Sequence, residues 1–251
     1  MRTLSIASYN IHKGLAPFNR RLTLPHLRER LRSLAADIVF LQEVVGRNDR
    51  HAERHDAWPE LPQHQFLAEG MWPGSAYGMT AVYDHGHHGN AILSRFPIVS
   101  AEQEDISTNR VEQRGLLHLE LKLPRTRTHL HCVCLHLGLL RRSRSVQLAL
   151  VRERLMRLVP AEAPLIVAGD FNDWSRKATA DFHDLGLREV FELTTGAPAR
   201  TFPARLPVLP LDRIYVRGLA VKRVQVHRGP AWARLSDHAP ITATLAWPRP
   251  Q

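Results

Sequence analysis

Acidic, amide and imidazole side chains recur in short motifs that follow or interrupt apolar runs. Asp170 and Asn172 follow the apolar residues 165–167, and Asp237 and His238 stand together ahead of the last apolar run. The junction of a buried strand and a loop is a usual position for catalytic side chains. These two motifs are therefore candidates for a catalytic site.

Other polar residues lie within or at the end of apolar runs. Asp212 lies inside the predicted strand at residues 211–216, and a carboxylate inside a strand is costly unless it is paired. His238 is the predicted partner, because a carboxylate that binds one imidazole nitrogen fixes the tautomer and orientation of the ring. Asn10 and Glu43 each close an earlier apolar run. For either one alone, a polar strand-end cap is the favoured interpretation, so the functional interpretation depends on several such residues occurring together.

Apolar spacing predicts the strands and helices that would position these side chains. Apolar runs bounded by turn residues predict strands, and three- and four-residue spacing predicts helices, the second behind Ser145 as its N-cap. Because these helices are too few to connect every pair of strands, we expect mixed sheets. The predicted strands are residues 4–9, 38–42, 91–94, 115–123, 129–137, 165–169, 211–216 and 239–246, and the predicted helices are 24–34 and 146–159.

Two stretches rich in proline and glycine interrupt this pattern. We interpret residues 46–89 as loops with a short helix near 49–58 and one or two strands, and residues 198–210 as a long surface loop. The histidines within residues 85–88 suggest a transition-metal site. A glycine-rich loop beside the active site is the favoured interpretation.

Composition indicates a packed, soluble protein with a polyanionic partner. Of 251 residues, 44% are apolar and 23% are charged, which fits one domain spanning residues 1–251. The net charge of +10 favours a phosphate-containing partner, although solubility alone also accounts for it. Cys132 and Cys134 suit neither a disulfide nor a zinc site. No run approaches the roughly 18 apolar residues of a transmembrane segment, and no signal peptide is recognisable, so a cytoplasmic location is expected.

Short motifs read in chain order resemble the endonuclease/exonuclease/phosphatase superfamily. Each motif alone is weak, whereas their order over nearly the whole chain is specific. The resemblance implies an α/β fold, a four-layer α/β/β/α sandwich with two packed mixed β-sheets, and a hydrolase acting on phosphate ester bonds. The motifs are Tyr9-Asn10-Ile11, Leu41-Gln42-Glu43, Gly89-Asn90-Ala91-Ile92-Leu93-Ser94-Arg95, Leu135-His136-Leu137, Gly169-Asp170-Phe171-Asn172, Leu211-Asp212-Arg213-Ile214 and Ser236-Asp237-His238.

The resemblance implies a metal site. Glu43 would be the principal ligand of a Mg²⁺ or Mn²⁺ ion, with Asn10 and Asp237 beside it, a set that suits a hard cation. Where the abasic-site endonucleases carry an acid two residues after the first asparagine, this chain has His12. The metal shell is therefore expected to lose a carboxylate at that position.

The resemblance also implies catalytic roles. Asp170 would orient or deprotonate the attacking water, and Asn172 would hold that water and a phosphoryl oxygen. His238, positioned by Asp212, would stabilise the charged transition state. His136 would contact the phosphate, where abasic-site endonucleases use a tyrosine.

Five further residues are candidate substrate contacts: Asn90, Arg114, Arg141, Arg142 and Arg144. The last three directly follow the predicted strand that carries the His136 motif. A charge cluster that caps the following helix is the alternative for them. Arg144 and Gln147 also match an Arg-x-x-Gln pattern of the family, and this match indicates a structural role for Arg144 as the alternative to substrate binding.

The expected substrate is a phosphate-containing polyanion. Positive charge spread over helices and loops favours nucleic acid, cleaved by an endonuclease or exonuclease. His136 is more typical of the sphingomyelinase and inositol-phosphatase branches, so an anionic phospholipid headgroup or a small phosphoester is the alternative. A non-catalytic polyanion-binding module is another, which the set of motif residues argues against. No protein partner is inferred.

Overall fold

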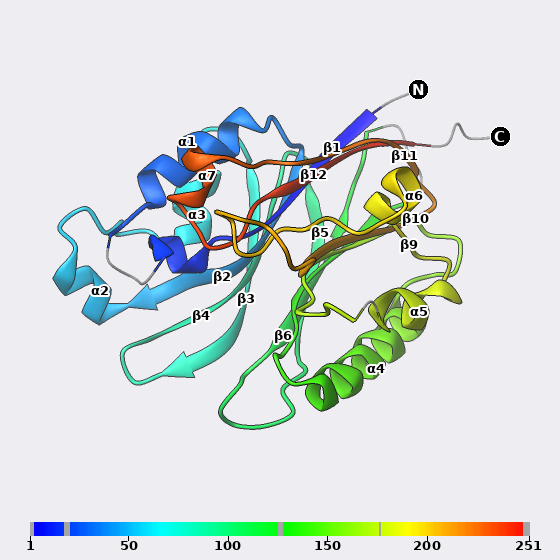
Figure 1. Cartoon of the computed structure of the whole chain (residues 1–251), viewed down its shortest axis with the longest axis horizontal. Helices are drawn as coiled ribbons and strands as arrows, with labels where there is room; N and C mark the ends of the chain where they lie inside the picture. The colour runs from blue at the N-terminus through cyan, green and yellow to red at the C-terminus, as the bar shows by residue number, and fades with distance from the viewer. Residues whose placement is uncertain (1–2, 18–20, 125–127, 176, 248–251) are drawn as a thin grey trace.

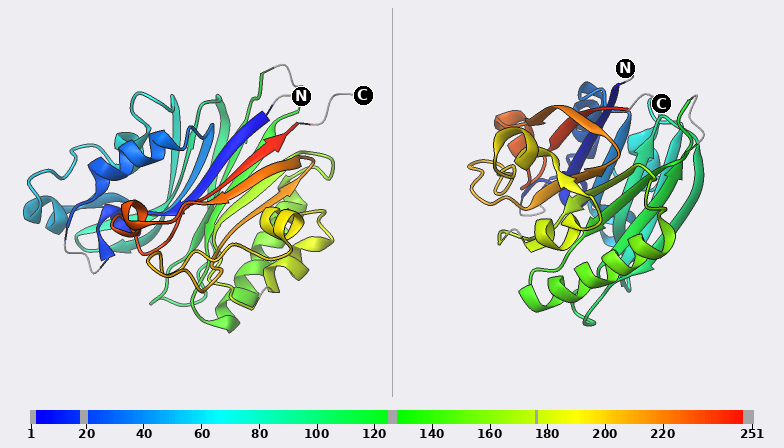
Figure 2. Two further views of the ribbon diagram at one scale, coloured as in Figure 1. Left: turned by 45° about the horizontal axis from the view of Figure 1, so that its top comes forward. Right: turned by 90° about the vertical axis from the view of Figure 1, so that its right-hand side faces the viewer.

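Two β-sheets stack face to face and helices cover their outer sides (Figures 1 and 2). The structure is a computed structural model that describes residues 3–17, 21–124, 128–175 and 177–247. Each sheet has six strands. The predicted sandwich with two packed mixed sheets is confirmed, because each sheet combines parallel and antiparallel neighbours.

The first sheet has the strand order β11-β12-β1-β2-β4-β3. β1 and β2 run parallel, whereas the other neighbours are antiparallel. Its strands are β1 (Thr3–Asn10), β2 (Ile38–Asn48), β3 (Gly74–Tyr83), β4 (Gly86–Ser94), β11 (Ala220–Val226) and β12 (Ile241–Ala246).

The second sheet repeats this plan in the order β5-β6-β7-β8-β10-β9. β7 and β8 run parallel at its centre, and the other neighbours are antiparallel. Its strands are β5 (Ile98–Asp105), β6 (Gly115–Leu121), β7 (Leu130–His136), β8 (Leu165–Asp170), β9 (Arg188–Glu189) and β10 (Asp212–Arg217).

Amphipathic helices cover the outer faces of both sheets. Leu27 and Leu31 of α1 (Leu24–Ser33) pack in one apolar cluster with the outer face of the first sheet. Val151 and Leu155 of α4 (Arg141–Leu158) do so on the second. The remaining short helices are η1 (His12–Gly14), α2 (Asp49–Arg54), α3 (Gln63–Ala68), α5 (Lys177–His183), α6 (Val190–Thr195) and α7 (Pro230–Ala233). No helix within the described ranges is long and apolar enough to cross a membrane.

The core between the sheets leads directly to the polar motifs. Alternate residues of a strand point to the same face. On β8, Ile166 and Ala168 lie in the inter-sheet core, and Asp170 is the next residue on that face. On β1, Ile6 lies in the same core, and Asn10 continues its face. The polar ends of both sheets therefore meet where the apolar core stops.

Two predicted boundaries were wrong. The second long helix begins at Arg141 and not at residue 146, and Ser145 lies inside it, where its Oγ donates to the Arg141 carbonyl at 3.1 Å. Apolar periodicity missed this first turn because its buried side chains include Ser143 and Arg144. Glu43 does not end its strand, since β2 continues to Asn48 through a register shift between Leu41 and Val44.

The stretch 46–89 is more regular than predicted. It contains the end of β2, α2, α3 and all of β3, and the hairpin to β4 turns at residues 84–85. The predicted glycine-rich loop at 85–88 was therefore wrong in part, because residues 86–88 pair with both β2 and β3. Polar residues in β3 and at the start of β4 interrupt the apolar alternation that predicts strands. The edge strands β5 and β11 were also missed, since they alternate exposed and half-buried positions.

Candidate active site

Strand register brings three of the predicted residues side by side. Asp170 ends β8 and pairs with His136 on parallel β7 and with Asp212 on antiparallel β10. Directly paired residues point to the same face of a sheet. His136, Asp170 and Asp212 therefore line the end of the second sheet, and their exposed fractions are 8%, 1% and 1%.

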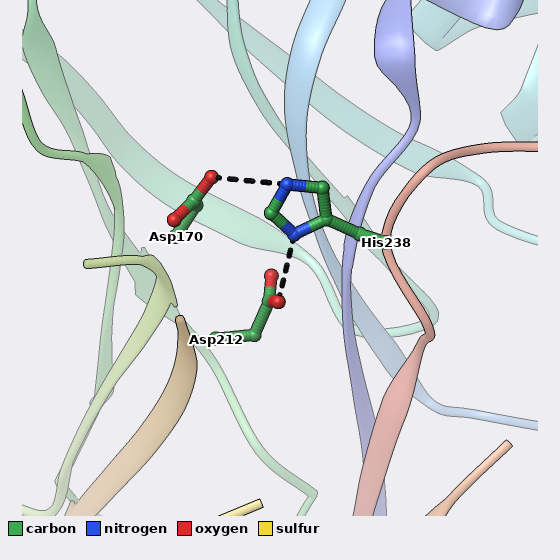
Figure 3. Close-up of side chains that lie close together, drawn as sticks. All are labelled: Asp170, Asp212 and His238. Atoms are coloured by element: carbon green, nitrogen blue, oxygen red, sulfur yellow. Dashed lines mark hydrogen bonds and ion pairs between the residues drawn. The ribbon is translucent and has the colours of Figure 1, made fainter. Parts of the chain in front are cut away.

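His238 reaches Asp170 and Asp212 from the segment that precedes β12 and forms a buried row with them (Figure 3). Its Nδ1 lies 2.8 Å from Asp212 Oδ2, and its Nε2 lies 3.6 Å from Asp170 Oδ2. The predicted pairing of Asp212 with His238 is present. Ser236 holds the segment in place, because its Oγ donates to the Asn10 carbonyl at 2.7 Å and accepts from the His238 amide at 3.2 Å. The Phe202 ring packs 5.0 Å from the imidazole, centroid to centroid.

Burial and mutual charge set the protonation of this cluster. Burial alone would lower the pKa of His238, but the carboxylates of Asp212 and Asp170 outweigh it and raise the pKa to about 10. Burial raises the pKa of Asp170 to about 6 against the opposing charge of His238. Burial lowers the pKa of His136 well below its usual value, and the charges of Arg114 and His238 add to this. At neutral pH, therefore, His238 is a cation and His136 is neutral.

Asp170 is the most heavily contacted member. Its Oδ1 accepts from the Asn172 amide at 3.0 Å, and its Oδ2 accepts from Asn10 Nδ2 at 3.1 Å. His136 Nε2 lies 3.4 Å from the same Oδ2. Asn172 donates through Nδ2 to the Leu137 carbonyl at 2.9 Å, so its side chain ties the loop after β8 to the loop after β7. These contacts fix the direction of the Asp170 carboxylate.

Glu43 and Asp237 form a second, more open group. Asn10 Nδ2 lies 3.3 Å from Glu43 Oε1 and so links this group to Asp170. Lys13 Nζ lies 3.8 Å from Glu43 Oε2, and His12 Nδ1 lies 3.2 Å from Asp237 Oδ1. The side chains of Glu43 and Asp237 are 19% and 30% exposed. Two half-buried carboxylates thus each carry a basic neighbour from the turn after β1.

Strained backbone concentrates at this site. Positive φ angles of 46°, 60°, 56° and 46° occur at His12, Lys13, Glu43 and Asn172. Of the described non-glycine residues, Ala35 alone shares this conformation elsewhere. Positive φ is uncommon outside glycine, and such strain clusters at functional sites. Here it turns Glu43 out of the alternation of β2.

The two groups differ in how well they fit a metal ion. Ligand atoms of Asp170, Asp212 and His238 lie within 4.8 Å of one another. These atoms already bond to neighbours, however, since His238 Nδ1 lies 2.8 Å from Asp212 Oδ2 and Asp170 Oδ2 accepts from Asn10, so this group is the poorer fit. Glu43 and Asp237 offer the oxygen ligands that hard divalent cations prefer, and they fit. Asn10 presents its amide nitrogen to Glu43 while its Oδ1 accepts from the His12 amide at 3.1 Å. Its oxygen would have to turn over to bind an ion.

Of the five predicted substrate contacts, some are buried in structural hydrogen bonds and others are exposed or lie beside His136. Asn90 is buried and donates to the Gly115 carbonyl at 2.8 Å, so it joins the two sheets. Arg114 donates to the Leu137 carbonyl at 3.2 Å beside His136. Arg144 is buried and donates to the Gly138 carbonyl at 3.2 Å, as the structural alternative predicted. Arg141 and Arg142 are exposed at the start of α4.

Sequence reasoning missed Lys13 and Ser236 as members of the site. Both belong to motifs that were recognised, one following Asn10 and His12 and the other preceding Asp237. Their contacts depend on the left-handed turn at residues 12–13 and on the approach of Ser236 to the end of β1. Periodicity carries no signal for either feature.

Comparison with known proteins agrees with this architecture. The Endonuclease/Exonuclease/phosphatase family matches residues 7–238, and the chain belongs to this family. Members of the family are phosphoester-hydrolysing enzymes. The uncharacterized protein YbhP of Escherichia coli is 44% identical over 244 residues, which span 97% of this chain and 96% of YbhP.

Solved structures share the fold at low sequence identity. An endonuclease/exonuclease/phosphatase from Beutenbergia cavernae superposes with a TM-score of 0.79 at 20% identity, covering 98% of this chain and 72% of that one. The mannosyl-6-phosphatase Bt3783 of Bacteroides thetaiotaomicron superposes with a TM-score of 0.72 at 22% identity, covering 97% and 100%. These two structures support the fold.

Proposed function

We propose that this chain is a divalent-metal-dependent hydrolase that cleaves phosphodiester bonds. The observation that carries the proposal is the buried row of Asp212, His238 and Asp170, with Glu43 and Asp237 beside it. One end of the row holds a fixed positive charge, and the other holds a carboxylate whose pKa of about 6 suits proton transfer near neutral pH.

Asp170 is proposed to accept a proton from the attacking water. As the new phosphorus–oxygen bond forms, that proton passes to the carboxylate, and the bond to the leaving oxygen breaks. The leaving oxygen takes its proton from solvent. Asn10 and Asn172 hold Asp170 in one direction through Nδ2 and the backbone amide, which orients the nucleophile.

His238 is proposed to stabilise the charge that develops on the phosphoryl oxygens. Asp212 holds its Nδ1, so Nε2–H stays directed into the site. Neutral His136, whose Nε2 lies 3.4 Å from Asp170 Oδ2, can donate its N–H to the same phosphoryl group. A preorganised cation in a buried site stabilises such charge more than one in water does.

Glu43 and Asp237, with Asn10 after rotation of its amide, are the residues proposed to hold the ion. Mg²⁺ or Mn²⁺ there would act as a Lewis acid that neutralises phosphoryl charge. Lys13 and His12 currently contact these carboxylates, so they would have to yield when the ion binds.

Hydrolysis of bis-p-nitrophenyl phosphate tests the proposal, with p-nitrophenyl phosphate alongside as a monoester. We expect turnover of the diester with Mg²⁺ or Mn²⁺, loss with EDTA and recovery when the metal is restored. Asp170→Asn, purified in the same way, controls for contaminating activity. Absence of turnover with both metals would contradict the proposal and favour a non-catalytic binding module.

Net charge alone does not distinguish between two classes of substrate. A charge of +10 suits both nucleic acid and anionic phospholipid. The two differ in what they require beside the phosphate. Single-stranded nucleic acid needs flat ring faces on which bases stack, whereas a lipid surface needs exposed apolar side chains with basic residues among them.

A further inference from the structure

Exposed apolar side chains gather on the loops next to the candidate active site. Val111, Leu139, Leu140 and Trp174 are 97%, 58%, 65% and 51% exposed, and we name these four residues the apolar rim. They belong to the β5–β6, β7–α4 and β8–α5 connections. Single exposed apolar residues are ordinary on a protein surface, but a group of them marks an interaction site.

Hydrogen bonds join these connections into one surface. The Leu139 amide donates to Glu112 Oε1 at 2.8 Å, which ties the β7–α4 loop to the β5–β6 loop. Arg144 donates to the Leu139 carbonyl, and its guanidinium lies 4.6 Å from the centre of the Trp174 ring. Figure 1 shows the β5–β6 connection beside the start of α4. The rim is therefore a fixed surface.

The rim adjoins the catalytic row directly. Asn172, two residues before Trp174, donates to the Leu137 carbonyl, two residues before Leu139. The loop before Asp212 adds further exposed apolar side chains. Leu206, Val208 and Leu209 of that loop are 73%, 51% and 37% exposed. A surface that contacted these loops would present its phosphates to the row of Asp170 and His238.

Exposed arginines accompany the apolar side chains. Arg141 and Arg142 directly follow Leu140, and Arg110 directly precedes Val111. In the ranges that the structure describes, no ion pair joins any of the three to a carboxylate. Their charge is thus available to an anionic partner. Basic residues near an anionic bilayer contribute attraction individually, and adjacent apolar side chains insert among the lipids.

Nucleic acid fits this rim less well. Leucine and valine offer no flat face for a base, and the Arg144 guanidinium already covers one face of Trp174. Duplex DNA would use the arginines but would leave the four apolar side chains against water. The mixture of aliphatic and guanidinium groups matches a bilayer of anionic phospholipid.

We infer that the apolar rim, together with Arg141 and Arg142, docks the chain on an anionic phospholipid bilayer so that the active site meets its substrate at the membrane surface. The inference rests on the proposed function, because it names the surface on which that hydrolase works. Binding itself requires no catalysis.

Flotation of the protein with lipid vesicles tests this surface. The probes are vesicles of phosphatidylcholine and vesicles of phosphatidylcholine with phosphatidylglycerol. Two double variants, L139S/L140S and R141Q/R142Q, are compared with V99S/M156S. Val99 and Met156 are 49% and 62% exposed and lie toward the opposite ends of β5 and α4.

We expect the wild-type chain to bind anionic vesicles and to bind neutral ones much less. L139S/L140S and R141Q/R142Q should each lower the partition coefficient by about tenfold or more, and the V99S/M156S control should change it less than about twofold. Equal losses in the control, no preference for anionic vesicles, or a rim-dependent binding of a short oligonucleotide in place of vesicles would overturn the inference.

The same measurements separate this inference from the proposed function. Asp170→Asn should bind vesicles like the wild-type chain, since it alters only the row behind the rim. Hydrolysis of the soluble diester without vesicle binding would overturn the docking surface alone. Vesicle binding without hydrolysis of any ester would overturn the hydrolase alone.

Discussion

The row of Asp170, Asp212 and His238 and the apolar rim are neighbours with opposite properties. The row consists of ionisable groups that are at most 5% exposed, and the rim consists of apolar groups that are at least 51% exposed. Ionisable side chains are usually exposed and large apolar side chains are usually buried, so both groups reverse the usual pattern of burial. Burial shifts the pKa values in the row, and exposure leaves the rim free to bind. The proposed chemistry and the proposed docking are therefore placed on separate surfaces.

Loss of Asp170, the proposed proton acceptor, should give the largest effect. Asp170→Asn keeps the size and the hydrogen-bonding positions of the side chain but removes its basicity. We expect kcat on bis-p-nitrophenyl phosphate to fall by about 10³-fold or more. Circular dichroism should confirm the fold of the variant. A loss of less than about tenfold would mean that another group accepts the proton.

Removal of one proposed metal-binding carboxylate should give the next largest effect. Glu43→Gln replaces an anionic oxygen with an amide, which a hard cation binds less well. We expect the dissociation constant for Mn²⁺, measured by its electron paramagnetic resonance signal, to rise about 10- to 100-fold, with activity falling in parallel. Glu53→Gln on the exposed face of α2 is the matched control. Unchanged Mn²⁺ binding would refute the assignment of Glu43.

Burial of a carboxylate away from the site should show in pH-dependent stability. Glu189 is 2% exposed and caps α6 by accepting from the Glu192 amide at 2.8 Å. Burial raises its pKa to about 7 from the ordinary 4.5. The folded chain therefore binds this proton more tightly than the unfolded chain, so its contribution to stability is full below pH 4.5 and is lost as pH rises through about 7.

Glu189→Gln should remove that dependence because the amide oxygen still caps the helix. Urea unfolding between about pH 5 and about pH 8 should show the wild-type chain losing roughly 1–3 kcal/mol more than the variant. Identical pH profiles would show that Glu189 is not protonated in the folded chain.

Substitution in the rim should have the smallest effect on stability. Leu139 and Leu140 are largely exposed, so L139S/L140S should shift the melting temperature by less than about 2 °C. Leu137→Ser, at a fully buried neighbour, should lower it by several times more. A large shift in the rim variant would show that these leucines pack in the folded chain.

Sequence predicted the row better than its surroundings. The cost of an unpaired acid in a strand was enough to pair Asp212 with His238, and the apolar run at 165–167 was enough to place Asp170 at the end of a strand. The register shift that turns Glu43 depends on backbone geometry at a single residue, which periodicity does not encode. The early start of α4 was hidden for a related reason, because its first turn is polar and has no side-chain cap.

The rim was beyond prediction for another reason. Leu139 and Leu140 extend the apolar character of the strand that ends at His136, and sequence alone does not separate an exposed leucine from a buried one. Arg144 was assigned two roles, and its contacts to the β7–α4 loop favour the structural one.

A double-mutant cycle on Asp212 and His238 tests the account most directly. Its central claim is that the two residues act as one unit, in which the carboxylate holds a cationic imidazole toward the phosphoryl group. Asp212→Asn, His238→Ala and the double variant are compared by kcat/KM on bis-p-nitrophenyl phosphate. We expect each single variant to lose about 10³-fold and the double variant to lose little more, because either change disables the unit. Losses that multiply in the double variant would contradict the account and give Asp212 a separate role.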